Sequence, residues 1–140
     1  MSKNSIIKLA GKISHELNYD PGKDLLEIIK KFGGEVIPPC SFEVDVINPS
    51  KFFLSYFSPT RFQLAHEFGH YVLHSVFGKK PLRINIGNSG IFEWEANWFA
   101  AGFLIPDHIL QNYPNCNNNK LAWIFKVPVA AVNLRSNLNV

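Results

Sequence analysis

One short run of the sequence, His66-Glu67-Phe68-Gly69-His70, constrains this chain more than any other feature. On an α-helix each residue turns by about 100°, so histidines four positions apart lie one above the other on the same face. Two imidazoles in that arrangement can bind one metal ion. Glu67 projects beside them, where it can take a proton from a water on that ion without filling a coordination position. The run therefore predicts a helix that carries a metal site, with zinc as the expected ion.

A catalytic zinc site uses three protein ligands, so a third donor is expected outside this run. The downstream candidates are His74, Glu93, Glu95, Asp107 and His108. His74 lies about two turns beyond His66 on the same helix, which is a poor position from which to complete a tetrahedral site. Packing, or hydrogen bonding near the cleft, is the expected role of His74.

Glu93 is the preferred third ligand, and Glu95 is the alternative. Residues 91–101 predict a second helix, and one face of that helix is apolar; this face carries Ala96, Phe99, Ala100 and Phe103. Glu95 lies about 200° round the helix from Glu93, so the two carboxylates cannot both face one ion. Asn97 follows Glu93 by four residues and is expected to accept a hydrogen bond from the outer ring N–H of a liganding histidine.

The composition is that of a single compact domain spanning residues 1–140. The chain is 46% hydrophobic, 14% aromatic and 18% charged, which suits one sizeable core and excludes a disordered chain. A net charge of +3 is too small for a dedicated nucleic-acid binder. Cys40 and Cys116 predict neither a disulfide framework nor a CxxC metal knuckle. The sequence shows no signal peptide and no membrane-spanning run, which predicts a cytoplasmic protein.

The apolar patterns predict an α+β fold in which a small, mainly antiparallel sheet packs against helices. Ser58-Pro59-Thr60 precedes the helix with the two histidines. Gly69 within that helix costs about 1 kcal/mol relative to alanine. This glycine predicts a neighbour that packs too closely for a Cβ, with simple tolerance of glycine as the alternative. The other predicted elements are a helix at 3–17, a helix that starts at Asp20-Pro21, three short strands within 35–56, a strand at 82–86, and a closing helical pair at 121–125 and 128–138.

Two blocks of the sequence together resemble a known protein family. The first, RFQLAHEFGHYVLH, runs from Arg61 to His74, and the second, EWEANWFAAGFLIP, runs from Glu93 to Pro106. The pair closely resembles the ImmA/IrrE-type zinc metallopeptidases, and residues 121–132 are similar to the closing helices of that family. The sequence departs from the usual pattern before Pro106, where a second leucine and a methionine often stand and this chain has Leu104-Ile105.

The resemblance implies a minimal gluzincin-like fold, with zinc on His66, His70 and Glu93 and with Glu67 as the catalytic carboxylate. It also implies an endopeptidase that cuts a protein partner, because members commonly act on helix-turn-helix repressors in phage, mobile-element or stress-response switches. Neither nucleic acid nor a membrane is an expected partner. Tyr71 and His74 are the candidates for a second donor to the oxyanion that forms during peptide hydrolysis.

Two other functions compete with this one. The first is a metal-containing module that binds and regulates a partner transcription factor or antitoxin without cutting it; Glu67 argues against it, because a structural site needs no such carboxylate. The second is a DNA-binding helix-turn-helix formed by the C-terminal helical pair, with Arg135 at its end. This arrangement is disfavoured because too few basic or amide side chains lie in register to contact bases. The residues of the pair that are expected in the core instead are Trp123, Ile124, Phe125, Val129 and Val132.

Overall fold

The computed structural model describes residues 1–31, 35–37, 51–53, 60–76 and 90–136, and helices dominate these segments. The helices are α1 (Lys3–Glu16), α2 (Leu25–Lys30), α3 (Arg61–His70), its π-helical continuation η1 (Tyr71–Val76), α4 (Gly90–Leu104), α5 (Asp107–Leu110), α6 (Asn118–Phe125) and α7 (Val129–Ser136). The strands are β1 (Glu35–Ile37) and β2 (Lys51–Phe53).

The predicted α+β fold with a mainly antiparallel sheet is wrong for this part of the chain. The described sheet has only β1 and β2, three residues each, and the two strands pair in parallel, with Val36 opposite Phe52. Residues 38–50 separate the strands in the sequence, which meets the length of about a dozen residues that a parallel connection needs. The sequence pattern marks extended segments but not the direction of pairing, because pairing depends on distant parts of the chain. The predicted strand at 82–86 lies outside the described residues.

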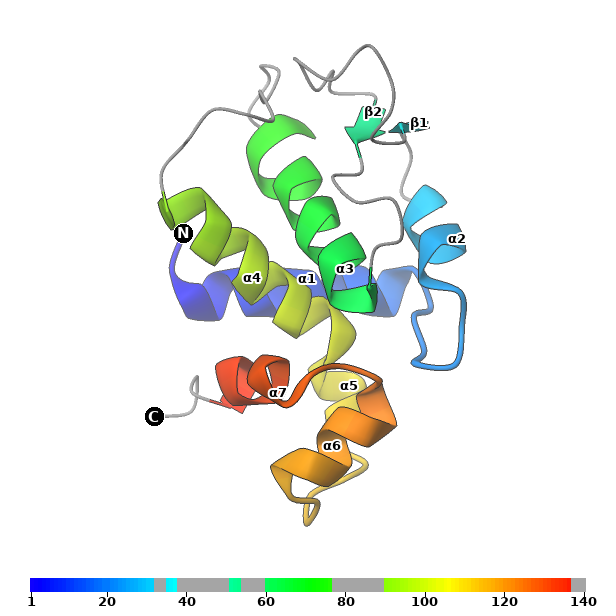
Figure 1. Cartoon of the computed structure of the whole chain (residues 1–140), viewed down its shortest axis with the longest axis vertical. Coiled ribbons are helices and arrows are strands. Elements are labelled where there is room, and N and C mark those ends of the chain that lie inside the picture. The colour runs from blue at the N-terminus through cyan, green and yellow to red at the C-terminus, as the bar shows by residue number, and fades with distance from the viewer. Residues whose placement is uncertain (32–34, 38–50, 54–59, 77–89, 137–140) are drawn as a thin grey trace.

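Helix α4 lies at the centre of the helical assembly and packs against α1, α3 and α7. Figure 1 shows α3 beside α4, α1 crossing behind both helices, and α6 and α7 below them. Phe68 of α3 makes edge-to-face ring contacts with Phe99 and Phe103 of α4, with ring centroids 5.6 and 5.5 Å apart. The apolar face predicted for α4 is confirmed, because all four of its residues are fully buried.

Two glycines allow α4 to approach its neighbours closely. A Cβ atom on Gly69 of α3 would lie 3.0 Å from the Cβ of Phe99 and 3.2 Å from the carbonyl oxygen of Ala96. A Cβ on Gly102 of α4 would lie 2.7 Å from the carbonyl oxygen of Ile7 in α1. The close neighbour predicted for Gly69 is therefore present, and a second glycine performs the same task on the other side of α4.

Side chains at the helix starts satisfy backbone N–H groups that would otherwise lack partners. Thr60 forms a capping box with Gln63 at the start of α3, as the position of Thr60 before the helix predicts. The second helix begins later than predicted: Asp24 caps α2 by accepting from the N–H groups of Leu26 and Glu27. Asp20 instead accepts from the N–H of Gly22 at 2.8 Å and stabilises the preceding turn.

The C-terminal helices are fixed to the rest of the domain by a buried arginine. Arg135 of α7 is 5% exposed, donates from Nε to the carbonyl oxygen of Ile105 at 2.9 Å, and pairs with Asp107. Phe125 and Val132 are buried and Ile124 is half-buried. Two of the predicted core positions are wrong: Trp123 is 79% exposed and Val129 is 39% exposed.

Among the helices that the structure describes, none is both long enough and apolar enough to cross a membrane.

We expect Gly102→Ala to lower the free energy of unfolding by about 1–3 kcal/mol, because the new methyl group would meet the backbone of α1. Gly11→Ala is the matched control in the same pair of helices. A Cβ there would lie 3.8 Å from its nearest neighbour, so the gain in helix propensity should stabilise the fold by about 0.5–1 kcal/mol. Urea denaturation of both variants measures the difference, and equal effects would contradict the close approach of α1 and α4.

Candidate metal centre

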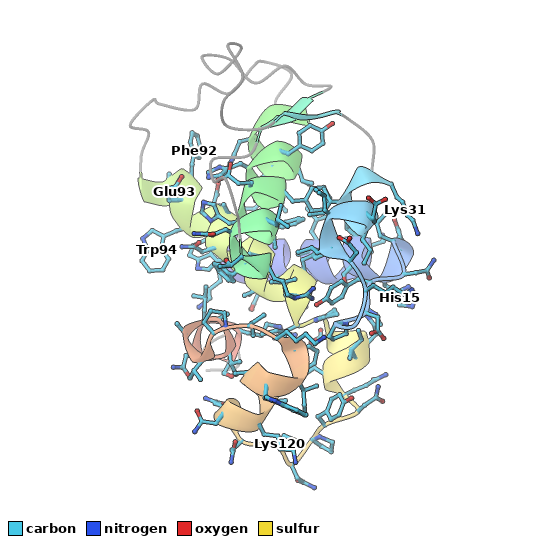
Figure 2. All side chains as sticks on the ribbon, turned by 45° about the vertical axis from the view of Figure 1, so that its right-hand side comes forward. His15, Lys31, Phe92, Glu93, Trp94 and Lys120 are labelled. Atoms are coloured by element: carbon cyan, nitrogen blue, oxygen red, sulfur yellow. The ribbon has the colours of Figure 1, made fainter. Side chains whose placement is uncertain are left out.

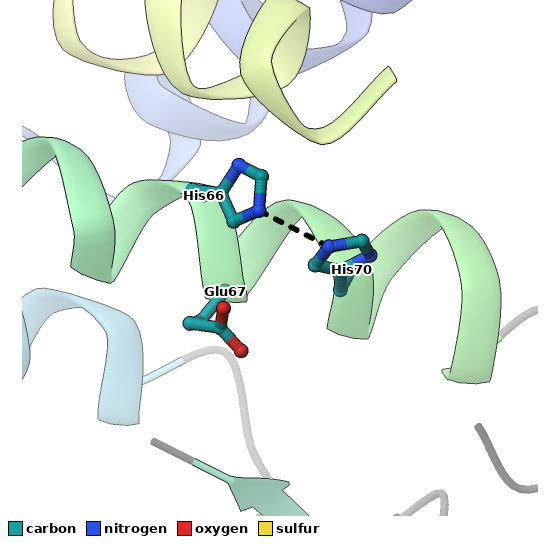
Figure 3. Close-up of side chains that lie close together, drawn as sticks. All are labelled: His66, Glu67 and His70. Atoms are coloured by element: carbon teal, nitrogen blue, oxygen red, sulfur yellow. Dashed lines mark hydrogen bonds between the residues drawn. The ribbon is translucent and has the colours of Figure 1, made fainter. Parts of the chain in front are cut away.

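The two histidines of the HExxH run face the same side of α3, as their spacing predicts. Their Nε2 atoms lie 3.2 Å apart, and both residues are buried, at 9% exposure for His66 and 8% for His70. Glu67 projects from the turn that links them (Figure 3). A potential ligand atom from each of these three residues lies within 4.8 Å of the other two, which makes this group a candidate metal site.

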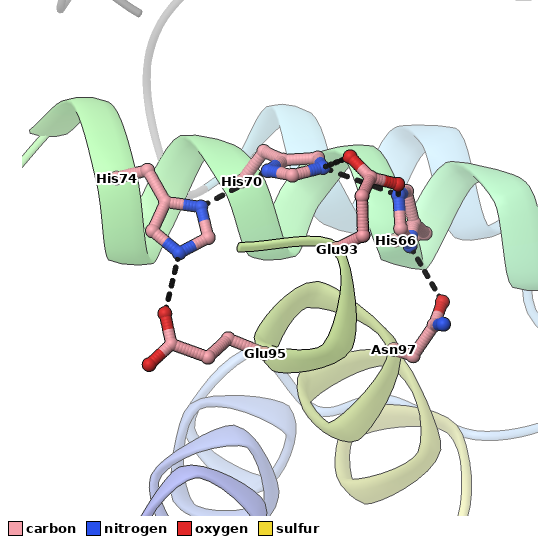
Figure 4. A network of polar contacts seen from close by, with 6 residues as sticks. All are labelled: His66, His70, His74, Glu93, Glu95 and Asn97. Carbon is pink, nitrogen blue, oxygen red and sulfur yellow. Dashed lines mark hydrogen bonds and ion pairs between the residues drawn. The ribbon is translucent and has the colours of Figure 1, made fainter. Parts of the chain in front are cut away.

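The carboxylate of Glu93, in the first turn of α4, contacts both imidazoles (Figure 4). Its Oε2 lies 3.0 Å from Nε2 of His66, and its Oε1 lies 2.9 Å from Nε2 of His70. The side chain of Glu93 is 57% exposed, whereas those of the histidines are 10–11% exposed. Phe92 and Trp94 flank Glu93 at this end of α4 (Figure 2). The cluster is therefore enclosed by the helices on the histidine side and open to solvent on the Glu93 side.

The outer nitrogen of each imidazole also has a partner (Figure 4). Nδ1 of His66 lies 2.8 Å from Oδ1 of Asn97, which is the contact expected for Asn97. Nδ1 of His70 lies 3.0 Å from Nδ1 of His74, and Nε2 of His74 lies 2.9 Å from Oε1 of Glu95. Asn97 and Glu95 both belong to α4, so this one helix supports both histidines of the candidate site.

These contacts determine where the protons of the neutral imidazoles lie. The amide oxygen of Asn97 can only accept, so His66 donates from Nδ1 and keeps a lone pair on Nε2. The carboxylate of Glu95 can also only accept. In its neutral form, His74 donates to Glu95 from Nε2 and receives the Nδ1 proton of His70. Both His66 and His70 are left with an Nε2 lone pair that points toward Glu93.

Burial is the main cause that lowers the pKa of His70 to about 4, and the repulsion that a second protonated imidazole at His66 would exert adds to it. His70 is therefore neutral at pH 7, the form in which an imidazole binds a metal. Two lone pairs and a carboxylate that lie within 3.2 Å of one another repel unless a cation lies among them. Donors that bind a tetrahedral zinc ion at 2.0–2.1 Å lie roughly 3.3 Å apart, close to these distances. The residues present thus fit a divalent cation, and a set of two histidines and one glutamate is one that zinc accepts.

The other residues considered as a third ligand lie elsewhere. Glu95 contacts His74 and not the pair of Nε2 atoms. Asp107 pairs with Arg135, and the ring of His108 packs on that of His15 with centroids 4.6 Å apart.

Tyr71 and His74, the candidates for an oxyanion donor, have different surroundings. Tyr71 is 5% exposed and its ring stacks on Phe68 in the core. Burial raises the pKa of the Tyr71 hydroxyl, which keeps it protonated as a donor would need to be. His74 has both ring nitrogens in contact with His70 and Glu95. The oxyanion role of either residue stays a prediction.

The family model described as the IrrE N-terminal-like domain, Peptidase M78, matches residues 58–137, which is more than half of the chain. The chain belongs to this family. The matched residues of this Peptidase M78 domain include α3, α4 and the C-terminal helices, and thus every residue of the cluster. No curated protein matches the chain. The predicted resemblance is confirmed, and the family together with the candidate metal cluster supports a metallopeptidase.

The sequence interpretation missed the pairing of His74 with Glu95 in this Peptidase M78 chain. The signal was present in the spacing, because His74 repeats the interval between His66 and His70, and Glu95 is a second acid on the ligand-bearing helix. The pairing itself depends on how the helices pack and on η1, the π-helical turn that carries His74. Such turns are frequent at functional sites.

We expect Glu95→Ala to weaken Zn²⁺ binding by about 10–100-fold, because His74 would lose the acceptor that fixes the Nδ1 proton of His70. Glu95→Gln is the matched control, since its amide oxygen can still accept from His74, and it should bind Zn²⁺ with an affinity closer to that of the unchanged chain. Competition with a coloured chelator measures both affinities. Equal weakening in the two variants would show that the charge of Glu95, and not its acceptor role, is what matters.

Proposed function

We propose that this chain is a zinc-dependent endopeptidase that hydrolyses a peptide bond in a protein partner. The observation that carries the proposal is the convergence of the Glu93 carboxylate on the Nε2 atoms of His66 and His70, with Glu67 in the same group. His66, His70 and Glu93 would hold the zinc ion, which leaves a fourth position for water and substrate. When bound, the ion supplies a Lewis acid that polarises the substrate carbonyl and lowers the pKa of water toward about 7.

The remaining steps belong to residues of the chain. Glu67 takes the proton of the attacking water as general base and returns it to the leaving amine as general acid. Asn97 and the pair of His74 and Glu95 hold the two imidazoles in the tautomer that the reaction needs. Because these partners are already in place in the folded chain, little reorganisation is needed when the substrate binds.

The substrate would approach from the exposed side of Glu93. From the family resemblance, we propose a helix-turn-helix transcriptional repressor as the protein partner, and the cytoplasm as the place where they meet. Arg135, the basic residue considered for DNA contact, is buried and holds α7 to the domain. This burial favours the peptidase over the DNA-binding alternative for the C-terminal helices.

We expect Glu67→Gln to lower kcat by about 10²–10⁴-fold while the protein still binds one equivalent of zinc, because the amide cannot accept the proton of water. His70→Ala should lose both zinc and activity, since it removes a donor from the cluster. Zinc content by atomic absorption, together with cleavage of the product of a neighbouring regulator gene and of fluorescent casein, measures the two effects.

Loss of zinc from Glu67→Gln equal to that from His70→Ala would contradict the assignment of Glu67 as a base. Incubation of the unchanged protein with the same regulator, with and without a chelator, distinguishes the peptidase from a non-cleaving module. Fragments that disappear when the chelator is added support the peptidase, and stable binding without fragments supports the module.

A further inference from the structure

A pocket with a volume of about 190 Å³ lies beside the candidate metal centre, between the start of α3, the middle of α4 and the start of α7. The described residues that line it are Phe62, Asn97, Pro128, Ala130, Ala131 and Leu134. Five of these side chains are apolar, and none of the six is ionisable. A charged group in this pocket would find no partner of opposite charge among these residues.

Asn97 connects the pocket to the metal centre. It lines the pocket, and its Oδ1 accepts the hydrogen bond from Nδ1 of His66 at 2.8 Å. On the opposite helix, Phe62 lies four residues before His66, which places it about 6 Å, slightly more than one turn, along the same face of α3. A peptide in an extended conformation advances about 3.3 Å per residue. The pocket is therefore within reach of a residue next to a peptide bond held at the cluster.

We propose that this pocket is a substrate subsite that takes one apolar side chain, leucine or phenylalanine in kind, from a residue that flanks the cleaved bond. This proposal rests on the proposed function, because it states which kind of side chain the substrate of the metal centre carries beside the cleaved bond. A volume of about 190 Å³ leaves room for one large apolar side chain. The amide oxygen of Asn97 accepts a hydrogen bond from His66, and this contact restrains the Asn97 side chain where it lines the pocket.

The test uses the full zinc-loaded chain and the hydroxamates of glycine, leucine, phenylalanine and aspartate, whose common head group chelates zinc. Isothermal titration calorimetry measures their affinities. We expect the leucine and phenylalanine compounds to bind at least about tenfold more tightly than the glycine compound, and the aspartate compound to gain nothing over glycine. This measurement does not require any cleavage.

Variants of the pocket identify where the side chain binds. Ala130→Phe should fill the pocket and remove the preference for leucine over glycine, while the affinity for the glycine compound stays the same. Val129→Phe is the matched control, because Val129 and Ala130 are neighbouring exposed positions of α7 and only Ala130 lines the pocket. Phe62→Ala should enlarge the pocket and shift the preference from leucine toward phenylalanine, and this variant serves if Ala130→Phe does not fold.

Equal affinity for the four hydroxamates would overturn the subsite, as would a preference for leucine that both pocket variants leave unchanged. The result also separates the subsite from the peptidase. If the preference for leucine is present and is removed by Ala130→Phe, the subsite stands even when no polypeptide is cleaved, and only the proposed hydrolysis fails.

Discussion

The close crossing of α4 between α1 and α3 is the contact on which the rest of the structure depends. Gly69 brings α4 against α3, and Gly102 brings α4 against α1. Gly69 is also part of the HExxH run, so α3 and α4 are in close contact beside the two histidines. This distance lets a side chain as short as that of Asn97 reach the outer nitrogen of His66. The glycine that allows the close packing of α3 and α4 therefore also allows the contact that orients His66.

Much of the candidate site could be predicted from the sequence because it follows from helix geometry. The spacing of His66 and His70 fixes their common face, and the spacing of Glu93 and Asn97 places both on one side of α4, where the structure has them. The role of Glu95 was not accessible in this way. Its contact with His74 spans two helices and depends on their separation and on a π-helical turn, neither of which a local pattern specifies.

The fold was less predictable where it depends on distant or competing contacts. The core faces of α1, α3 and α4 repeat with the helical period, and their burial follows from it. The pairing of β1 with β2 does not, because a short run of β-branched and aromatic residues carries no information on strand direction. Asp20 and Asp24 are both suitable caps, and the choice between them is made by the turn that Asp20 stabilises. Trp123 is apolar but exposed. Its burial was predicted wrongly because composition alone does not say which side of a short helix has a neighbour.

The two groups of metal-binding candidates belong to different helices, with His70 and Glu93 separated by 23 positions in the sequence. A cation shared between them would close a loop of the chain and act as a reversible cross-link from α3 to α4. Anything that binds the folded chain and not the unfolded one adds stability in proportion to the logarithm of its free concentration, once that concentration exceeds the dissociation constant. The amount of folded protein in a cell would thus depend on the free concentration of the metal ion. The same donors that prepare the site for chemistry would then also couple the stability of the chain to the metal supply.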